Sequence, residues 1–190
     1  MTDFAARLIG DVKGAGIGLW RLMKLDPAWA AGFDASAGGF VRSFAGPLLS
    51  LPLYLLVASM VAREAAGGAG LYWGAALELI ADAAAYPAVM AVVARAFGVG
   101  EGYGAFIVVT NWSQLFLNLV LAAASPLALA GDNGMVAFRF VWLLLLLASI
   151  YITWRAARQT LSTEIAPALL SVVLSVAISE GASRLAEALS

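Results

Sequence analysis

The stretch FVWLLLLLASIYITW, residues 140–154, contains no charged side chain and decides the class of fold. With the residues that precede it, it forms a run over 135–154 that ends at Arg155 and Arg158. A helix needs about 20 mostly apolar residues to cross the roughly 30 Å of hydrocarbon in a bilayer. Residues 135–154 therefore predict a transmembrane helix.

The composition extends this prediction to the whole chain. Of 190 residues, 63% are hydrophobic and 12% are charged, and the mean hydropathy is +0.91. Soluble domains are about 45–50% apolar and about 25% charged, and one of this length could not bury so much apolar surface. We therefore expect an integral membrane protein of the all-α class.

Four further segments predict membrane spans, and short connections join them into one antiparallel helical bundle. A row of serines at intervals of four, Ser171, Ser175 and Ser179, predicts a helix-packing face in the last span. The prolines inside the spans each remove a helical hydrogen bond. The five expected spans are 44–62, 71–94, 104–129, 135–154 and 166–184, and together they make a transmembrane domain over 44–190.

Basic residues set the expected orientation, because cytoplasmic loops carry an excess of Lys and Arg. Eight basic residues belong to one side and three to the other, which predicts an N-terminus inside and a C-terminus outside. The eight are Arg7, Lys13, Arg21, Lys24, Arg42, Arg95, Arg155 and Arg158; the three are Arg63, Arg139 and Arg184. Abundant Ala and Gly favour a bacterial inner membrane as the location.

The absence of two residue types limits the chemistry. The chain has neither Cys nor His, which excludes thiolate nucleophiles, iron–sulfur clusters, zinc–thiolate sites and histidine bases. No phosphate-binding or hydrolase motif is present, and a net charge of −1 gives no case for nucleic acid. We expect no enzyme, no cofactor and no metal site.

The N-terminal segment, 1–43, differs from the rest. Apolar residues recur at near-helical spacing among basic ones, although Gly14, Gly16 and Gly18 interrupt the pattern. We interpret it as a bent amphipathic helix at the cytoplasmic interface, with a partly ordered tail as the alternative. Asp26 and Pro27 predict a helix N-cap and first helical residue. The residues expected to meet the membrane surface or a partner are Arg7, Lys13, Trp20, Arg21, Lys24 and Trp29.

Glu78 and Asp82 lie one helical turn apart near the middle of the second expected span. A charge at that depth costs at least about 2.5 kcal/mol, so we expect polar partners. The antiparallel third span offers an amide stripe at matching depth, and the fourth offers a cation near Glu78. The predicted intramembrane cluster comprises Glu78, Asp82, Asn111, Gln114, Asn118 and Arg139.

Three interpretations of this cluster remain open. It could form a proton or cation pathway, or a site for a small polar substrate. It could equally be a satisfied polar network that fixes helix partners and register. In the third interpretation the second span slides toward its C-terminal half and Glu78 reaches the surface.

Two segments resemble the YIP family of Ypt/Rab-interacting membrane proteins. The family's penultimate span, basic loop and final span resemble VWLLLLLASIYITWRAARQTLSTEIAPALLSVVLS in this chain. A glycine-containing loop followed by a span that begins with polar residues resembles AFGVGEGYGAFIVVTNWSQLFLNLV. The likeness covers about half the chain. It implies a non-enzymatic protein that binds or organises other proteins and lipid. The chain departs from the family in lacking a long cytoplasmic N-terminal domain.

The sequence therefore predicts an accessory or scaffold subunit whose partners are the lipid bilayer and either another membrane protein or further copies of itself. The alternative function is a small proton- or cation-coupled transporter or channel that uses the intramembrane cluster.

Overall fold

The computed structural model describes the backbone of residues 2–64, 70–161 and 165–189, all of it helices and short connections without a strand. Inside the helices, some side chains lie outside the described part, among them those of Glu78 and Asp82. The all-α prediction is confirmed for the described residues. The helices are α1 (Thr2–Met23), η1 (Pro27–Gly32), α2 (Ala37–Ser43), α3 (Ala45–Glu64), α4 (Gly70–Ala96), α5 (Gly100–Ala124), η2 (Ser125–Leu129), α6 (Gly131–Thr160) and α7 (Ile165–Leu189).

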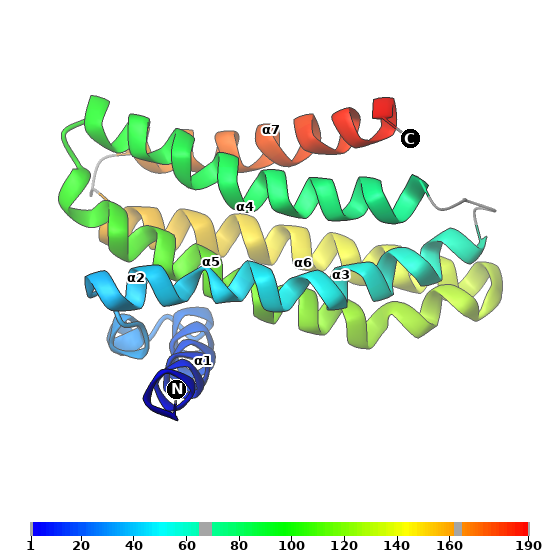
Figure 1. The fold of residues 1–190 in the computed structure, drawn as a ribbon, viewed down its shortest axis with the longest axis horizontal. Coiled ribbons are helices and arrows are strands. Elements are labelled where there is room, and N and C mark those ends of the chain that lie inside the picture. Colours follow the sequence, from blue (N-terminus) through cyan, green and yellow to red (C-terminus); the bar gives the residue numbers. More distant parts are fainter. Residues whose placement is uncertain (1, 65–69, 162–164, 190) are drawn as a thin grey trace.

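The long helices α3 to α7 lie side by side and form an antiparallel bundle (Figure 1). α4 packs mainly on α7, and α5 packs on both α3 and α6. Each expected span falls within one of these helices, or within α5 and η2 together, except that the first begins at Phe44, one residue before α3. Short α2 lies in line with α3, so the first apolar stretch begins seven residues before the boundary that we expected at 44.

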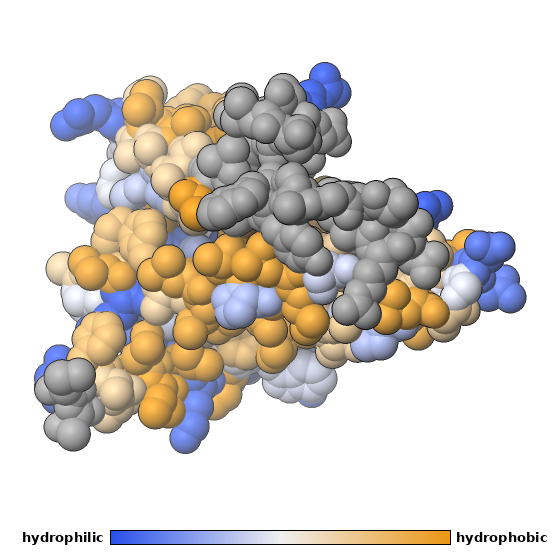
Figure 2. Space-filling model, turned by 45° about the vertical axis from the view of Figure 1, so that its right-hand side comes forward, coloured by the Kyte–Doolittle hydropathy of each residue, from blue (hydrophilic) through white to orange (hydrophobic). Residues whose placement is uncertain are grey.

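Three helical stretches in the described residues are long and apolar enough to cross a membrane: Ala37–Val61, Gly100–Leu129 and Gly131–Thr160. α4 and α7 contribute the shorter apolar stretches Ala83–Ala96 and Ile165–Ile178. Much of the apolar surface faces outward, and Phe140 on α6 is 60% exposed. Figure 2 shows the same pattern where one face is coloured: apolar side chains fill its interior, and most strongly hydrophilic ones lie toward its margins. Such a surface suits lipid rather than water.

The termini of the elements follow local rules. Asp26 is the N-cap of η1, its carboxylate accepts the N–H of Ala28 at 2.8 Å, and Pro27 begins the helix, which confirms that prediction. Ser36 caps α2 by accepting the N–H of Gly39 at 3.1 Å. Gly98, in the turn before α5, and Gly131, the first residue of α6, have positive φ, a conformation that costs glycine little.

α1 is one helix from Thr2 to Met23 and continues through its glycines, which differs from the interrupted helix that we expected. The glycines instead allow η1 to pack closely on α1. A β-carbon on Gly14 would lie 2.6 Å from the carbonyl oxygen of Gly32, and one on Gly18 would lie 2.9 Å from that of Trp29. Because Gly14 and Gly18 lie one turn apart, they form a groove into which η1 packs closely.

Candidate functional site

A partly open cavity of about 370 Å³, lined by both polar and apolar residues, lies between α4, α5, α6 and α7. Its α5 wall consists of residues in the middle of that helix, and its other walls come from the middle of α6 and from α4 and α7. This volume falls within the range of small-molecule sites. The polar residues that line it are Tyr86, Thr110, Asn111, Ser113, Gln114, Ser149, Thr153, Ser175 and Glu180.

The hydroxyl groups along this cavity are mostly bonded to their own helices. Thr110 donates to the carbonyl of Ile107 at 3.1 Å, and Ser113 donates to that of Thr110 at 2.8 Å. Ser175 of α7 donates to the carbonyl of Val172 at 2.8 Å. Each of these oxygens keeps lone pairs for a further hydrogen bond, because a hydroxyl has one proton and two lone pairs.

The α4 wall is shaped by Pro87. Proline has no N–H, so the carbonyl of Ala83, four residues earlier, loses its helical donor, and both residues line the cavity. Tyr103 of α5 donates to the carbonyl of Pro87 at 2.9 Å and ties the two helices together. Tyr86 donates to the carbonyl of Ser171 at 3.3 Å and joins α4 to α7.

The structure brings together only part of the intramembrane cluster that the sequence predicts. Asn111 and Gln114 line the cavity, and Asn111 also donates to the hydroxyl of Ser43 in α2 at 3.0 Å. Asn118 is partly buried and Arg139 is exposed, and neither lines the cavity. The side chains of Glu78 and Asp82 lie outside the described residues, so the expected pairs with them remain predictions.

The N-terminal surface takes its form from α1. Its inner face buries Ala15, Leu19 and Leu22, which are at most 7% exposed. Its outer face carries large apolar side chains, with Trp20 64% exposed and Ile17 53% exposed. Lys13 and Lys24 are exposed as well. The ammonium of Lys24 sits 4.5 Å from the centroid of the Trp20 ring, a cation–π contact.

The other residues that we expected at this surface differ in their surroundings. Arg7 pairs with Asp3 at 2.9 Å within α1, and Arg21 lies 3.7 Å from Asp26. Trp29 is only 2% exposed, which differs from the contact with the membrane surface or a partner that we expected. It packs in the core, and its indole N–H donates to the side chain of Gln159 in α6. Trp29 therefore fastens η1 to the bundle.

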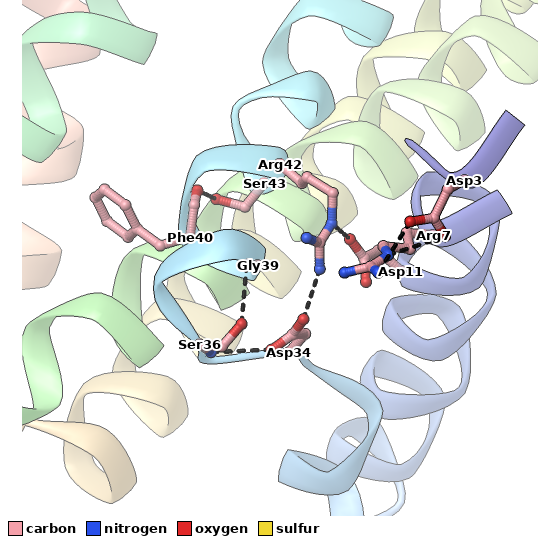
Figure 3. Close-up of polar contacts among 9 residues, drawn as sticks. All are labelled: Asp3, Arg7, Asp11, Asp34, Ser36, Gly39, Phe40, Arg42 and Ser43. Atoms are coloured by element: carbon pink, nitrogen blue, oxygen red, sulfur yellow. Dashed lines mark hydrogen bonds and ion pairs between the residues drawn. The ribbon is translucent and has the colours of Figure 1, made fainter. Parts of the chain in front are cut away.

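Arg42 of α2 pairs with two carboxylates, and one of these pairs ties α1 to α2 (Figure 3). Its guanidinium lies 2.6 Å from Asp11 of α1 and 2.5 Å from Asp34 in the segment before α2. The side chains of Arg42 and Asp11 are each 12% exposed, so this pair is screened less than one in open solvent. We call Arg42, Asp11 and Asp34 the N-terminal clasp.

Asp34 should make the clasp sensitive to acid. Hydrogen bonds from Ser36, with the guanidinium of Arg42, lower the pKa of Asp34 below its ordinary value of 3.8. A lowered folded-state pKa contributes stability above the unfolded pKa, and this contribution is lost as the pH falls through the folded-state value. We expect the amide protection of residues 27–43, measured by hydrogen exchange and corrected for intrinsic rates, to fall below about pH 4. Asp34→Asn should flatten this dependence, and an identical pH profile in that variant would contradict the assignment.

Sequence reasoning missed the clasp and much of the cavity. Arg42 and Asp11 are 31 positions apart, and no local pattern pairs them. Ser149 and Thr153 look like ordinary small residues of an apolar span. Their interval of four places both on one helix face, which is the one signal that could have found them.

Comparison with known proteins does not extend this description. The chain matches no model of a known protein family, and neither the curated proteins nor the solved structures contain a significantly similar one.

Proposed function

We propose that this protein is a non-enzymatic multi-pass membrane protein that acts as an accessory or scaffold subunit and organises lipid and protein partners. In this proposal α3 to α7 all cross a bacterial inner membrane, with the N-terminus inside and the C-terminus outside. The observation that supports it best is the outer face of α1, which presents apolar and basic side chains beside one end of an apolar bundle.

The direction of α1 supports a place in the membrane interface. α1 runs across the long helices rather than along them (Figure 1), so it lies parallel to the bilayer surface if those helices cross the bilayer. The α4–α5 and α6–α7 connections are at the same end of the bundle. Arg95, Arg155 and Arg158 precede these connections, which suits the cytoplasmic leaflet.

The side chains on the outer face of α1 match the chemistry of an anionic bilayer. Ile17 and Trp20 can enter the boundary between headgroups and acyl chains, while Lys13 and Lys24 meet the phosphates. Each basic residue near an anionic surface adds about 1 kcal/mol of attraction. The N-terminal clasp and the buried Trp29 hold α1 at a fixed depth, as a surface that organises lipid requires.

Lys13→Gln combined with Lys24→Gln should weaken binding of phosphatidylglycerol about 30-fold, because two attractions of about 1 kcal/mol each are removed. The measurement is native mass spectrometry of the whole protein titrated with phosphatidylglycerol or phosphatidylcholine in mild detergent. Arg139→Gln, the loss of one exposed positive charge elsewhere on the bundle, serves as the control. Equal binding of the two lipids by the unchanged protein would contradict the lipid part of the proposal.

The partner part of the proposal has its own test. Affinity purification of the tagged chain from native membranes should yield either a stoichiometric membrane protein or a defined homo-oligomer by native mass. This expectation agrees with what the resemblance to the YIP family implies. A protein that remains monomeric and captures nothing under these conditions would contradict it.

A further inference from the structure

The cavity is separate from the outer face of α1. Several of its oxygens accept hydrogen bonds, and the amides of Asn111 and Gln114 carry donors as well. The hydroxyls of Thr110, Ser113 and Ser175 donate their protons to backbone carbonyls, so only their lone pairs remain for a ligand. The carbonyl of Ala83 adds an acceptor that Pro87 leaves without its helical donor. A ligand that supplies donors can therefore bond to all of these oxygens.

Two further hydroxyls of the cavity carry no protein hydrogen bond. Across the described part of the chain, no such bond involves the side chains of Ser149 or Thr153, although Thr153 is only 6% exposed. Each of these two hydroxyls can donate a hydrogen bond to a ligand or accept one from it.

The charge of the cavity selects against anions. Among the described residues that line it, Glu180 is the acidic one and none is Lys or Arg. Glu180 receives a bond from Arg184 at 2.8 Å but remains 60% exposed, so a carboxylate oxygen stays accessible to a second cation. Trp142 also lines the cavity and presents an aromatic ring to a positive group.

The remaining lining is apolar and suits a short hydrocarbon chain. Leu117, Leu146, Ile150 and Val176 line the cavity beside the acceptors. Its volume of about 370 Å³ equals that of roughly a dozen waters at about 30 Å³ each, more than a bare ion fills. Acceptors, one carboxylate, an aromatic ring and an apolar wall together describe a site for an amphiphilic cation.

We propose that this cavity binds a small protonated amine with a short apolar chain. Its ammonium group donates to the oxygens of Thr110, Ser113 and Ser175 and lies near Glu180, while its chain packs on the leucines and Ile150. An alkylamine of this kind is charged at neutral pH, because the pKa of an amine such as lysine is about 10.4.

The test compares three probes of equal chain length, butylammonium, butan-1-ol and butyrate, binding to the whole protein in nanodiscs. Tryptophan fluorescence gives the signal, since Trp142 lines the cavity. Butylammonium should bind at least about tenfold more tightly than butan-1-ol, as expected for a charge-assisted hydrogen bond, and butyrate should not compete. Equal responses from all three probes, unchanged in Ser149→Phe, would mean partition into lipid only and would overturn the proposal.

Substitutions of single side chains test which groups of the cavity bind the amine. Glu180→Gln, an exposed substitution, should weaken butylammonium about tenfold and leave butan-1-ol unchanged. Ser113→Ala with Ser175→Ala should also weaken it. Ser59→Ala is the matched control, because Ser59 donates to the carbonyl of Leu56 in the same manner and lies outside the cavity. Unchanged butylammonium affinity in Glu180→Gln would overturn the role of the carboxylate. This result would not affect the proposal that α1 binds lipid, which has its own test.

Discussion

Replacing Gly46 with valine should lower the free energy of unfolding by about 3 kcal/mol, because it overpacks the contact between α3 and α5. Gly46 is buried, and a β-carbon there would overlap the carbonyl oxygen of Asn111 and lie 3.0 Å from its carbonyl carbon. Both groups belong to helix backbone, so no side chain can rotate away. The two helices must separate instead, which costs packing along their length.

Thermal unfolding in detergent, followed by circular dichroism, measures this effect. For a chain of this size the midpoint should fall by roughly 6–12 °C. Gly10→Val is the matched control, since nothing lies within 4 Å of a β-carbon at that position. Equal midpoints for Gly46→Val and Gly10→Val would contradict the close approach of α3 to α5.

Arg42→Leu should loosen the attachment of α1 to the bundle. Without the guanidinium, Asp11 and Asp34 lose their shared cation, and Asp11 is left 12% exposed next to an apolar side chain. Hydrogen exchange across residues 2–32 should accelerate about tenfold, because charge-assisted hydrogen bonds are among the stronger side-chain contacts. Exchange in α5 and α6 should change little.

Arg7→Leu is the control for Arg42→Leu. Its partner Asp3 lies four residues away on the same helix, and the two side chains are 63% and 77% exposed. Exposed pairs of this kind contribute little to stability. The clasp would be contradicted if the two variants exchanged at the same rate in α1.

The helices themselves could be predicted from the sequence. The run over 140–154 lies within α6, and the segment 104–129 coincides with α5 and η2 apart from four residues at its start. Asp26 and Pro27 marked the start of η1 because capping depends on adjacent residues alone. Apolar length and local capping are properties of a short segment, so the sequence contains them directly.

The candidate sites depended on packing between segments that are distant in the chain. The clasp joins Asp11 to Arg42, and the cavity combines Pro87 of α4 with Thr153 of α6 and Ser175 of α7. Trp29 had the composition of a surface anchor, yet its contact with Gln159, 130 positions away, buries it.

The amino-acid sequence by itself thus determined the class of fold, the positions of the helices and the chemistry that the chain lacks, because each follows from composition or from neighbours within a few turns. Only the tertiary structure decided that α1 crosses the bundle, that its glycines receive η1, and that scattered hydroxyls line one cavity. Those features depend on which helix faces meet. Many pairings of apolar helices satisfy the same pattern of hydrophobic residues, and side-chain packing selects one of them.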